Sequence, residues 1–221
     1  MTKQGKPLVL LVAFLFNEIT RYNRGMFSAP FFGVVSSLFI LVGAIPYIKD
    51  IFKKQVHPHV LSWLGWGLIT GLGAAAMYAD GSTWMAVIVF ANTIACLSIA
   101  FFAAVRKVGV WETSGFDWFF FFMGLLGVVL WQTLDMPILA LICAMVADFA
   151  FGIPTIIKTY LNPETETLFV WVAATLSGFF SLFAIQTIAF HEIAYPVYLL
   201  FFDSTVLLLV LKIVKKKKAG A

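Results

Sequence analysis

The sequence predicts an all-α polytopic membrane protein with seven transmembrane helices, arranged as two parallel three-helix bundles joined by a linker helix. Three observations predict this fold class: an apolar composition, seven apolar stretches of membrane-spanning length, and an internal repeat. Of the 221 residues, 62% are hydrophobic and 12% are charged, and the mean hydropathy is +0.96. A soluble domain of this size would need far more charge to cover its surface, so the composition favours a lipid bilayer as the solvent.

Each apolar stretch has the length of a membrane-spanning helix. Crossing about 30 Å of hydrocarbon at about 1.5 Å per residue takes about 20 residues. The stretches exceed the reach of a barrel strand and lack its alternation of polar and apolar residues, so they are predicted to be helices. The predicted helices cover residues 31–49, 60–80, 84–105, 117–135, 137–157, 167–189 and 194–214.

The distribution of Lys and Arg predicts the orientation of these helices. Basic residues follow the first, third, fifth and seventh helices, whereas the loops after the second, fourth and sixth helices contain none. Basic loops stay on the cytoplasmic side, so we expect a cytoplasmic C-terminus, and the compact loops favour the inner membrane of a bacterium. The net charge of +4 then reflects topology, and no nucleic-acid partner is predicted. The basic residues are Lys49, Lys53, Lys54, Arg106, Lys107, Lys158, Lys212 and Lys215 to Lys218.

Residues 1–30 do not follow this alternation. Seven helices with a cytoplasmic C-terminus place them on the opposite side of the membrane, where the loops contain no Lys or Arg, yet they carry four basic residues. Their apolar stretch, residues 7–16, is too short to span a membrane. Three interpretations stay open: an interfacial helix, the apolar core of a signal peptide, or an extension upstream of a translation start at Met26. The four basic residues are Lys3, Lys6, Arg21 and Arg24.

An internal repeat relates the first three helices to the last three. Residues 45–66 and 153–171 each begin with Ile-Pro, place a Lys shortly after that proline, and then reach a second proline and a tryptophan. The predicted organisation is therefore a first repeat (31–107), a linker helix (108–136), a second repeat (137–214) and a basic tail (215–221). The matched positions are Pro46 with Pro154, Pro58 with Pro163, Trp66 with Trp171, Thr70 with Thr175, Gly73 with Gly178, and Asn92 with Asp203.

Three helices per repeat plus one linker helix give both repeats the same direction through the membrane. Transporters built from such repeats bind their solutes at the repeat interface, near the middle of the bilayer. The repeat therefore predicts a site between the two three-helix units.

This plan resembles the SWEET and PQ-loop superfamily, in which a proline lies near the cytoplasmic end of the first helix of each unit. The second repeat is also similar to the pattern of an uncharacterised bacterial branch of seven-helix proteins. The resemblance covers residues 30–214 and implies the fold; known members carry sugars or export amino acids with protons, so the solute stays open. The residues that carry the resemblance are Pro46, Asp148, Pro154, Thr155, Lys158, Pro163 and Glu166.

Three polar residues are expected near the middle of the bilayer: Asn92, Asp148 and Asp203. A carboxylate at that depth costs about 2.5–3.5 kcal/mol, so it should face a cavity or the bundle interior. A carboxyl group buried without a cation favours its protonated form, which suits a group that exchanges a proton or binds a cation. The alternatives are a protonated Asp bonded to a neighbouring helix, and an Asn92 that only joins helices.

Two prolines and two tryptophans are further candidates. Pro46 and Pro154 each remove a helix hydrogen bond, and either gating hinges or static kinks would result. Trp66 and Trp171 are predicted to be anchors at the membrane interface, and the alternative is that they stack on a ligand.

The sequence indicates neither an enzyme nor a cofactor. It contains no phosphate-binding loop, nucleophile elbow or metalloprotease helix. His57, His59 and His191 fall in predicted loops without a third ligand nearby, so no metal site is predicted.

The leading hypothesis is a carrier of a small polar solute that works by alternating access, with proton or cation coupling as a secondary hypothesis. Its expected partners are the solute and the bilayer, and a homo-oligomer is left open. The alternative is a receptor or scaffold that does not transport, as the related KDEL receptors are.

Overall fold

The computed structural model describes residues 29–79, 81–111, 137–187 and 189–219, and seven single positions between them. The single positions are 115, 118, 119, 122, 126, 129 and 133, all of them helical with exposed side chains. The N-terminal segment and most of the predicted linker helix therefore lie outside the described residues.

The continuous described ranges form six α-helices, and their sequence contains no long polar segment that would build a separate domain. The five of membrane-spanning length and apolarity indicate an integral membrane protein. The remaining helix, Leu168–Ser181, is shorter, and two 3₁₀ turns flank it, Pro163–Thr165 and Leu182–Ala184. The helices are α2 (Ala29–Phe52), α3 (Val60–Ala79), α4 (Thr83–Arg106), α6 (Pro137–Leu161), α7 (Leu168–Ser181) and α8 (Phe190–Ala219).

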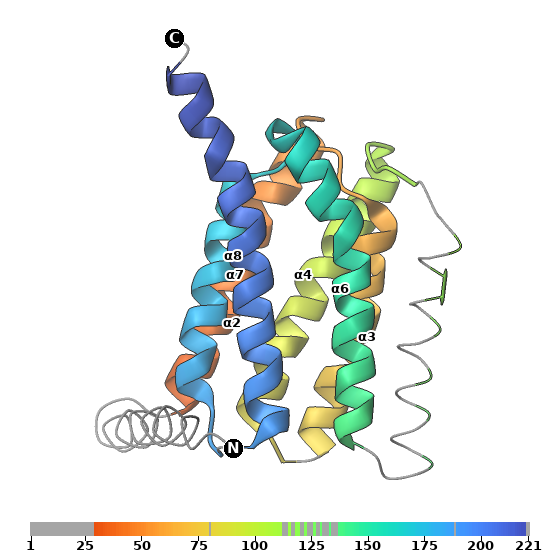
Figure 1. Ribbon diagram of the computed structural model, residues 1–221, viewed down its shortest axis with the longest axis vertical. Coiled ribbons are helices and arrows are strands. Elements are labelled where there is room, and N and C mark those ends of the chain that lie inside the picture. Colours follow the sequence, from red (N-terminus) through yellow and green to blue (C-terminus); the bar gives the residue numbers. More distant parts are fainter. Residues whose placement is uncertain are drawn as a thin grey trace, which may run out of the picture.

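The six helices lie side by side (Figure 1), and the contacts between them form a ring. Helix α4 packs between α2 and α3, and α8 packs between α6 and α7. Two further contacts, α2 with α7 and α3 with α6, close the ring. The first three helices therefore meet the last three along two seams.

The outer surface of the ring is apolar. On α2 the exposed residues Phe31, Val34, Leu38, Val42 and Ile45 recur every three or four positions and form one continuous face. A soluble protein rarely exposes so large an apolar area, whereas hydrocarbon chains are a suitable neighbour for it.

Glycines allow close approach at both seams. A Cβ atom added to Gly43 on α2 would lie 2.6 Å from the Cβ of Ala173 on α7. One added to Gly65 on α3 would lie 2.8 Å from the ring of Phe151 on α6. Both distances are shorter than carbon atoms tolerate, so the seams depend on the missing side chains.

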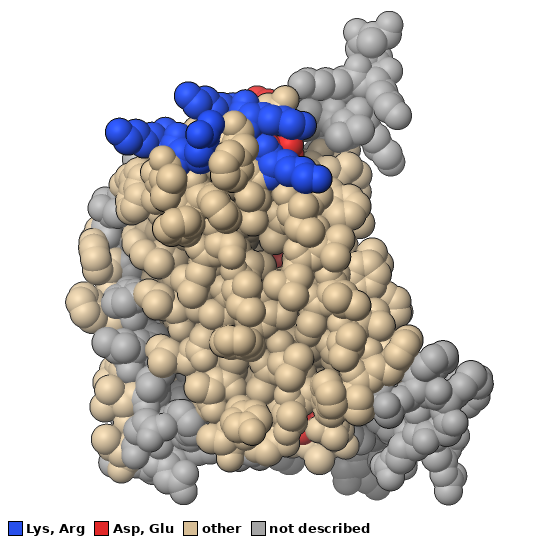
Figure 2. Space-filling model, turned by 180° about the vertical axis from the view of Figure 1, so that it is seen from behind, with Lys and Arg blue, Asp and Glu red and all other residues tan. Residues whose placement is uncertain are grey.

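The basic side chains gather at one end of the ring, where α2 and α4 end and α3 begins (Figure 2). The flank seen in that view carries few charged side chains. The described basic side chains at this end, called the basic end below, are Lys49, Lys53, Lys54, Arg106, Lys107 and Lys158.

Helix α7 is shorter than predicted. The sequence predicted a span over 167–189, but the regular helix ends at Ser181, and the chain is extended at Ile185 after one 3₁₀ turn. The buried carboxylate of Glu192 accepts hydrogen bonds from the backbone N–H groups of Gln186 (2.7 Å) and Thr187 (2.8 Å). A side chain outside the helix thus satisfies donors that a longer helix would have used.

Glu192 also joins the two halves of the ring at the end opposite the basic residues. Its other oxygen accepts a hydrogen bond of 3.2 Å from the hydroxyl of Ser82, which precedes α4. One carboxylate therefore holds the loop after α7 and the start of α4 together.

We expect Glu192→Ala to lower the stability of the folded protein by about 2 kcal/mol, because a charged acceptor of three hydrogen bonds is lost. Thermal unfolding of the purified protein in detergent measures the change. Glu192→Gln, which keeps an acceptor oxygen, should lose less, and Glu164→Ala, at an exposed glutamate, should change little. Equal losses in Glu192→Ala and Glu164→Ala would contradict this role.

Candidate functional site

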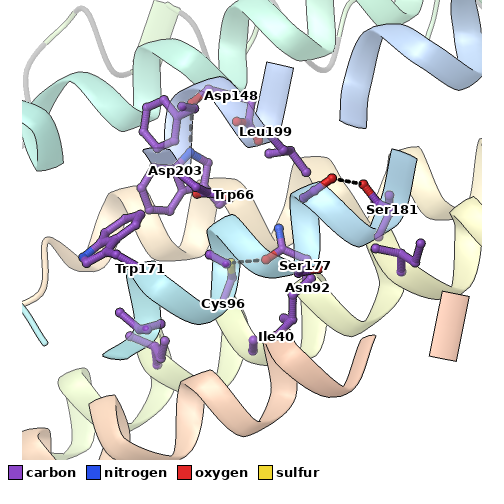
Figure 3. Close-up of a pocket in the computed structure, with 18 of the residues that line it drawn as sticks. Ile40, Trp66, Asn92, Cys96, Asp148, Trp171, Ser177, Ser181, Leu199 and Asp203 are labelled. Carbon is purple, nitrogen blue, oxygen red and sulfur yellow. Dashed lines mark hydrogen bonds between the residues drawn. The ribbon is translucent and has the colours of Figure 1, made fainter. Parts of the chain in front are cut away.

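A cavity of about 70 Å³ lies inside the ring, and all six α-helices contribute to its wall (Figure 3). A water molecule needs about 10–15 Å³ on this measure, so the cavity has room for several waters or a small solute. Helices α4 and α7 supply most of the wall, and α2 and α6 each supply one residue.

The three polar residues singled out from the sequence all line this cavity. Asn92 comes from α4, Asp148 from α6 and Asp203 from α8 (Figure 3). The three helices approach the cavity from different sides, so a solute inside it could contact all three side chains.

Asp148 is buried, and both oxygens of its carboxyl group accept a hydrogen bond. Its Oδ2 accepts a hydrogen bond of 2.7 Å from the Tyr198 hydroxyl, and its Oδ1 accepts one of 3.3 Å from the Tyr195 hydroxyl. Its backbone carbonyl accepts a hydrogen bond of 2.8 Å from the ring nitrogen of Trp66. Asp148 therefore joins α6 to both α8 and α3.

The sequence analysis missed the two tyrosines. Tyr195 and Tyr198 are three positions apart, so both hydroxyls point from one face of α8. Phe202 continues the same face at the next turn, and Asp203 follows it directly. The signal available in the sequence was a pair of hydroxyl-bearing side chains three positions apart on an otherwise apolar span.

Asp203 differs from Asp148, because its carboxyl group makes no hydrogen bond with any residue in the described ranges. Asn92 is nearly as free: its Oδ1 accepts only a weak, 3.7 Å contact from the thiol of Cys96. Both side chains are partly buried and line the cavity. They are thus the polar groups that a bound solute could use.

The cavity wall carries no cation. Its ionisable groups are the carboxyls of Asp148 and Asp203 and the thiol of Cys96, and no Lys, Arg or His lies among the described residues that line it. The rest of the polar wall is Asn92, two serines and tryptophan ring nitrogens. Four aromatic side chains complete it: Trp63, Trp66, Trp171 and Phe202.

The prediction that Trp66 and Trp171 are interfacial anchors is wrong. Their side chains are 6% and 3% exposed, and both line the cavity. Trp66 donates to the carbonyl of Asp148, and Trp171 donates to Glu166 Oε2 at 3.1 Å. Internal acceptors, rather than lipid headgroups, therefore satisfy both ring nitrogens.

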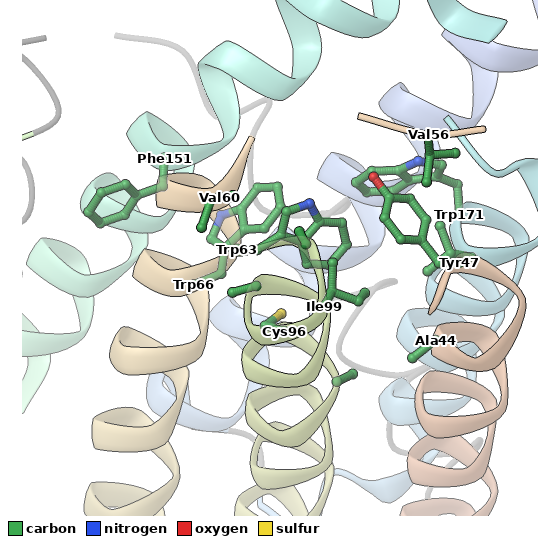
Figure 4. Packing of buried hydrophobic residues seen from close by; sticks show 14 of the residues in the cluster. Ala44, Tyr47, Val56, Val60, Trp63, Trp66, Cys96, Ile99, Phe151 and Trp171 are labelled. Atoms are coloured by element: carbon green, nitrogen blue, oxygen red, sulfur yellow. The ribbon is translucent and has the colours of Figure 1, made fainter. Parts of the chain in front are cut away.

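An aromatic layer lies on the side of the cavity nearer the basic end and forms part of the cavity wall; Figure 4 shows its rings. The ring centroids of Trp63 and Tyr47 are 5.2 Å apart, and those of Trp63 and Trp171 are 6.2 Å apart. These three residues come from α3, α2 and α7, so the layer crosses the seam between the two halves.

Two polar contacts cross the same seams at the basic end. The ammonium group of Lys158 forms an ion pair with the buried carboxylate of Glu166 and donates a hydrogen bond of 2.8 Å to the carbonyl of His57. The hydroxyl of Thr167 donates a hydrogen bond of 2.7 Å to Asp50 Oδ2. The first contact joins α6 to the segment before α3, and the second joins α7 to α2.

Pro46 and Pro154 lie inside α2 and α6, near the aromatic layer. Each helix continues to its end beyond the proline, although the carbonyls of Val42 and Ala150 lose their usual N–H partner there. Whether these sites act as hinges stays a prediction. A third proline, Pro196, lies inside α8.

No group of three or more His, Cys, Asp or Glu side chains in the described part of the chain could hold a metal ion. His57 Nδ1 lies 3.1 Å from the Val108 carbonyl, and His59 Nδ1 lies 2.8 Å from the Ser62 hydroxyl. Both described histidine side chains thus have local hydrogen-bond partners.

No family model, curated protein or solved structure matches this chain.

We expect Lys158→Met to destabilise the protein by about 2 kcal/mol, because Glu166 would keep a buried charge without its cation. Glu166→Gln in the same chain should recover about half of that loss, since the leftover charge is then removed. Chemical or thermal unfolding of the single and double variants measures the coupling. Lys49→Met, at an exposed lysine, is the matched control, and a strictly additive double variant would refute the coupling.

Proposed function

We propose that this protein is a carrier of a small polar solute that works by alternating access, with the cavity as its binding site. The observation that supports this most directly is an internal cavity bounded by all six helices, with Asn92, Asp148 and Asp203 in its wall. Membrane proteins rarely place carboxyl groups inside an apolar bundle without a functional reason.

The packing of the helices supports a duplicated, 3+1+3 architecture with a linker helix between α4 and α6. In each half the third helix packs between the first and the second. The seam between α2 and α7 joins the first helix of one half to the second helix of the other, and the seam between α3 and α6 does the reverse. A two-fold axis along the membrane normal produces this pattern, as expected for parallel repeats.

Residue pairs around the cavity support the same architecture. The two halves align with shifts of 108, 105 and 111 positions in their first, second and third helices (154 − 46, 171 − 66 and 203 − 92). Under these shifts, four aligned pairs have both members in the cavity wall. The pairs are Ile40 with Asp148, Trp66 with Trp171, Ile88 with Leu199, and Asn92 with Asp203.

The two glycine contacts are also equivalent. The same shifts align Gly43 with Phe151 and Gly65 with Val170. A Cβ on Gly43 would lie 3.8 Å from the Cα of Val170, and one on Gly65 would touch the ring of Phe151. Each seam thus places a glycine of the first half against a larger residue of the second half, with the glycine on the first helix of its half at one seam and on the second helix at the other.

Contacts at the two ends of the cavity would serve as gates. At the basic end, which we assign to the cytoplasm of a bacterial cell, the aromatic layer and the Lys158–Glu166 pair close the site. At the other end, Glu192 and Ser82 join the halves. Alternating access requires that the contacts at one end of the cavity open while those at the other end stay closed. Pro46 and Pro154 lie toward the basic end, where α2 and α6 would bend as that end opens.

Proton or cation coupling would use Asp203, whose carboxyl has no cation and no hydrogen-bond partner in the described ranges. Asp148 already accepts two tyrosine hydroxyls, so its protonation would change those bonds as well. Each carboxyl therefore offers a different way to connect proton uptake with closure of the site.

We expect Asp148→Asn and Asp203→Asn to remove the pH dependence of flux in proteoliposomes and to lower its rate about tenfold or more. Labelled glucose, alanine, ethanolamine and malate represent the sugar, amino-acid, amine and organic-acid classes, each measured at two pH values. Glu164→Gln, at an exposed glutamate, is the matched control and should behave as wild type.

Wild-type rates with unchanged pH dependence in both Asp variants would rule out the site. Binding of one of these solutes without any flux would instead favour a receptor of the same fold.

A further inference from the structure

The cavity wall contains one carboxyl group, that of Asp203, that has no hydrogen-bond partner in the described ranges. Beside it, the neutral amide of Asn92 has an oxygen and two N–H donors, and the oxygen is contacted by the thiol of Cys96. The Ser181 hydroxyl already donates to the Gly178 carbonyl at 2.7 Å. A solute that supplies hydrogen-bond donors therefore finds an unused acceptor in Asp203.

The charge of the wall also selects a solute. Two carboxyl groups face or border the cavity without a Lys, Arg or His among its described lining residues. Each oxygen of Asp148 already accepts a tyrosine hydroxyl, so Asp203 is the carboxyl group with more free acceptor capacity for a solute. In a water-poor site, a carboxylate attracts a cation much more strongly than it does in water.

The aromatic walls suit the same kind of solute. The ring nitrogens of Trp66 and Trp171 donate to protein acceptors, so these side chains offer ring surface to the cavity. Phe202, next to Asp203 in the chain, packs edge-to-face with Trp66 at 5.7 Å. Aromatic rings beside a carboxyl group are a favourable environment for an ammonium group and its carbon atoms.

The ring nitrogen of Trp63 is a buried donor of the wall that has no hydrogen-bond partner in the described ranges. A neutral oxygen of a solute, such as a hydroxyl or ether, would have a partner there. A carboxylate would not be compensated, because one neutral N–H group cannot offset a full negative charge at this depth.

From these contacts we infer that the solute is a small organic amine with one positive charge and no acidic group. This inference rests on the proposed carrier function and names the solute of the same site. The ammonium group binds Asp203 and Asn92, and its carbon chain lies against Trp66, Trp171 and Phe202. Anions and zwitterionic amino acids are rejected because no cation in the described wall compensates their carboxylate, and a neutral sugar would leave the Asp203 carboxyl without a charged partner.

The first test compares four two-carbon probes of similar size: ethanolamine, glycine, glycolate and ethylene glycol. They represent a cation, a zwitterion, an anion and a neutral molecule. We expect ethanolamine alone to raise the unfolding temperature of the purified protein at millimolar concentrations. Asp203→Asn should weaken its apparent affinity about tenfold or more, whereas Glu164→Gln should not change it. An equal or larger shift with any other probe, or no shift with ethanolamine, would overturn the inference.

The second test does not depend on the choice of amine, because it uses Cys96 in the cavity wall as a reporter in a Cys143→Ser background. Two thiol reagents of similar size are compared, cationic 2-aminoethyl methanethiosulfonate and anionic 2-sulfonatoethyl methanethiosulfonate. Each rate is divided by the rate of the same reagent with a free thiol in solution. On this scale the cationic reagent should modify Cys96 about tenfold faster than the anionic reagent does, and Asp203→Asn should reduce this preference. Equal rates, or a preference that Asp203→Asn leaves unchanged, would overturn the inference.

The two proposals fail in different ways. Flux of glucose, alanine or malate without an effect of ethanolamine would overturn the amine inference and leave the carrier in place. Binding of ethanolamine without flux of any solute would overturn the carrier and leave an amine-binding site. A Cys96 that neither reagent reaches would overturn both, since a carrier must open its site to one side of the membrane.

Discussion

The structure depends on one constraint: a polar group placed inside an apolar bundle must find its partner within the protein. Hydrocarbon offers no hydrogen bonds, so each buried carboxyl group needs a donor from another helix or loop. Asp148 has two tyrosine hydroxyls, Glu166 has Lys158 and Trp171, and Glu192 has two backbone N–H groups and a serine. Asp203 makes no such bond in the described ranges and lines the cavity instead.

These partners also connect the two halves of the ring at three depths. Glu192 bonds to Ser82 at the end opposite the basic residues, Trp66 bonds to Asp148 at the cavity, and Lys158 bonds to the His57 carbonyl at the basic end. Glycines bring the helices close at both seams, so small shifts of one half against the other change several polar contacts together. A bundle with polar contacts above and below a cavity has the parts that a two-state carrier requires, which is why we favour transport over a static scaffold.

Much of the fold could be predicted because hydropathy and helix length leave few alternatives in a bilayer. Helices α2, α3 and α4 lie within three residues of the predicted limits, and the basic residues meet at one end as their alternation implied. The candidate site was only partly predictable. Asn92, Asp148 and Asp203 stand out as polar residues in apolar helices, whereas Tyr195 and Tyr198 look like ordinary aromatic residues near a helix end until α8 is packed against α6.

The sequence by itself therefore determined which segments are apolar enough to cross a bilayer and which polar residues interrupt them, because both follow from composition and chain length along one helix. The tertiary structure decided what depends on contacts between helices. It ended α7 early through the carboxylate of Glu192, turned Trp66 and Trp171 inward, and left Asp203 open to the cavity while Asp148 accepted two tyrosine hydroxyls. The physical reason is that hydropathy is a property of a segment, whereas a hydrogen-bond partner is a property of the neighbour that packing supplies.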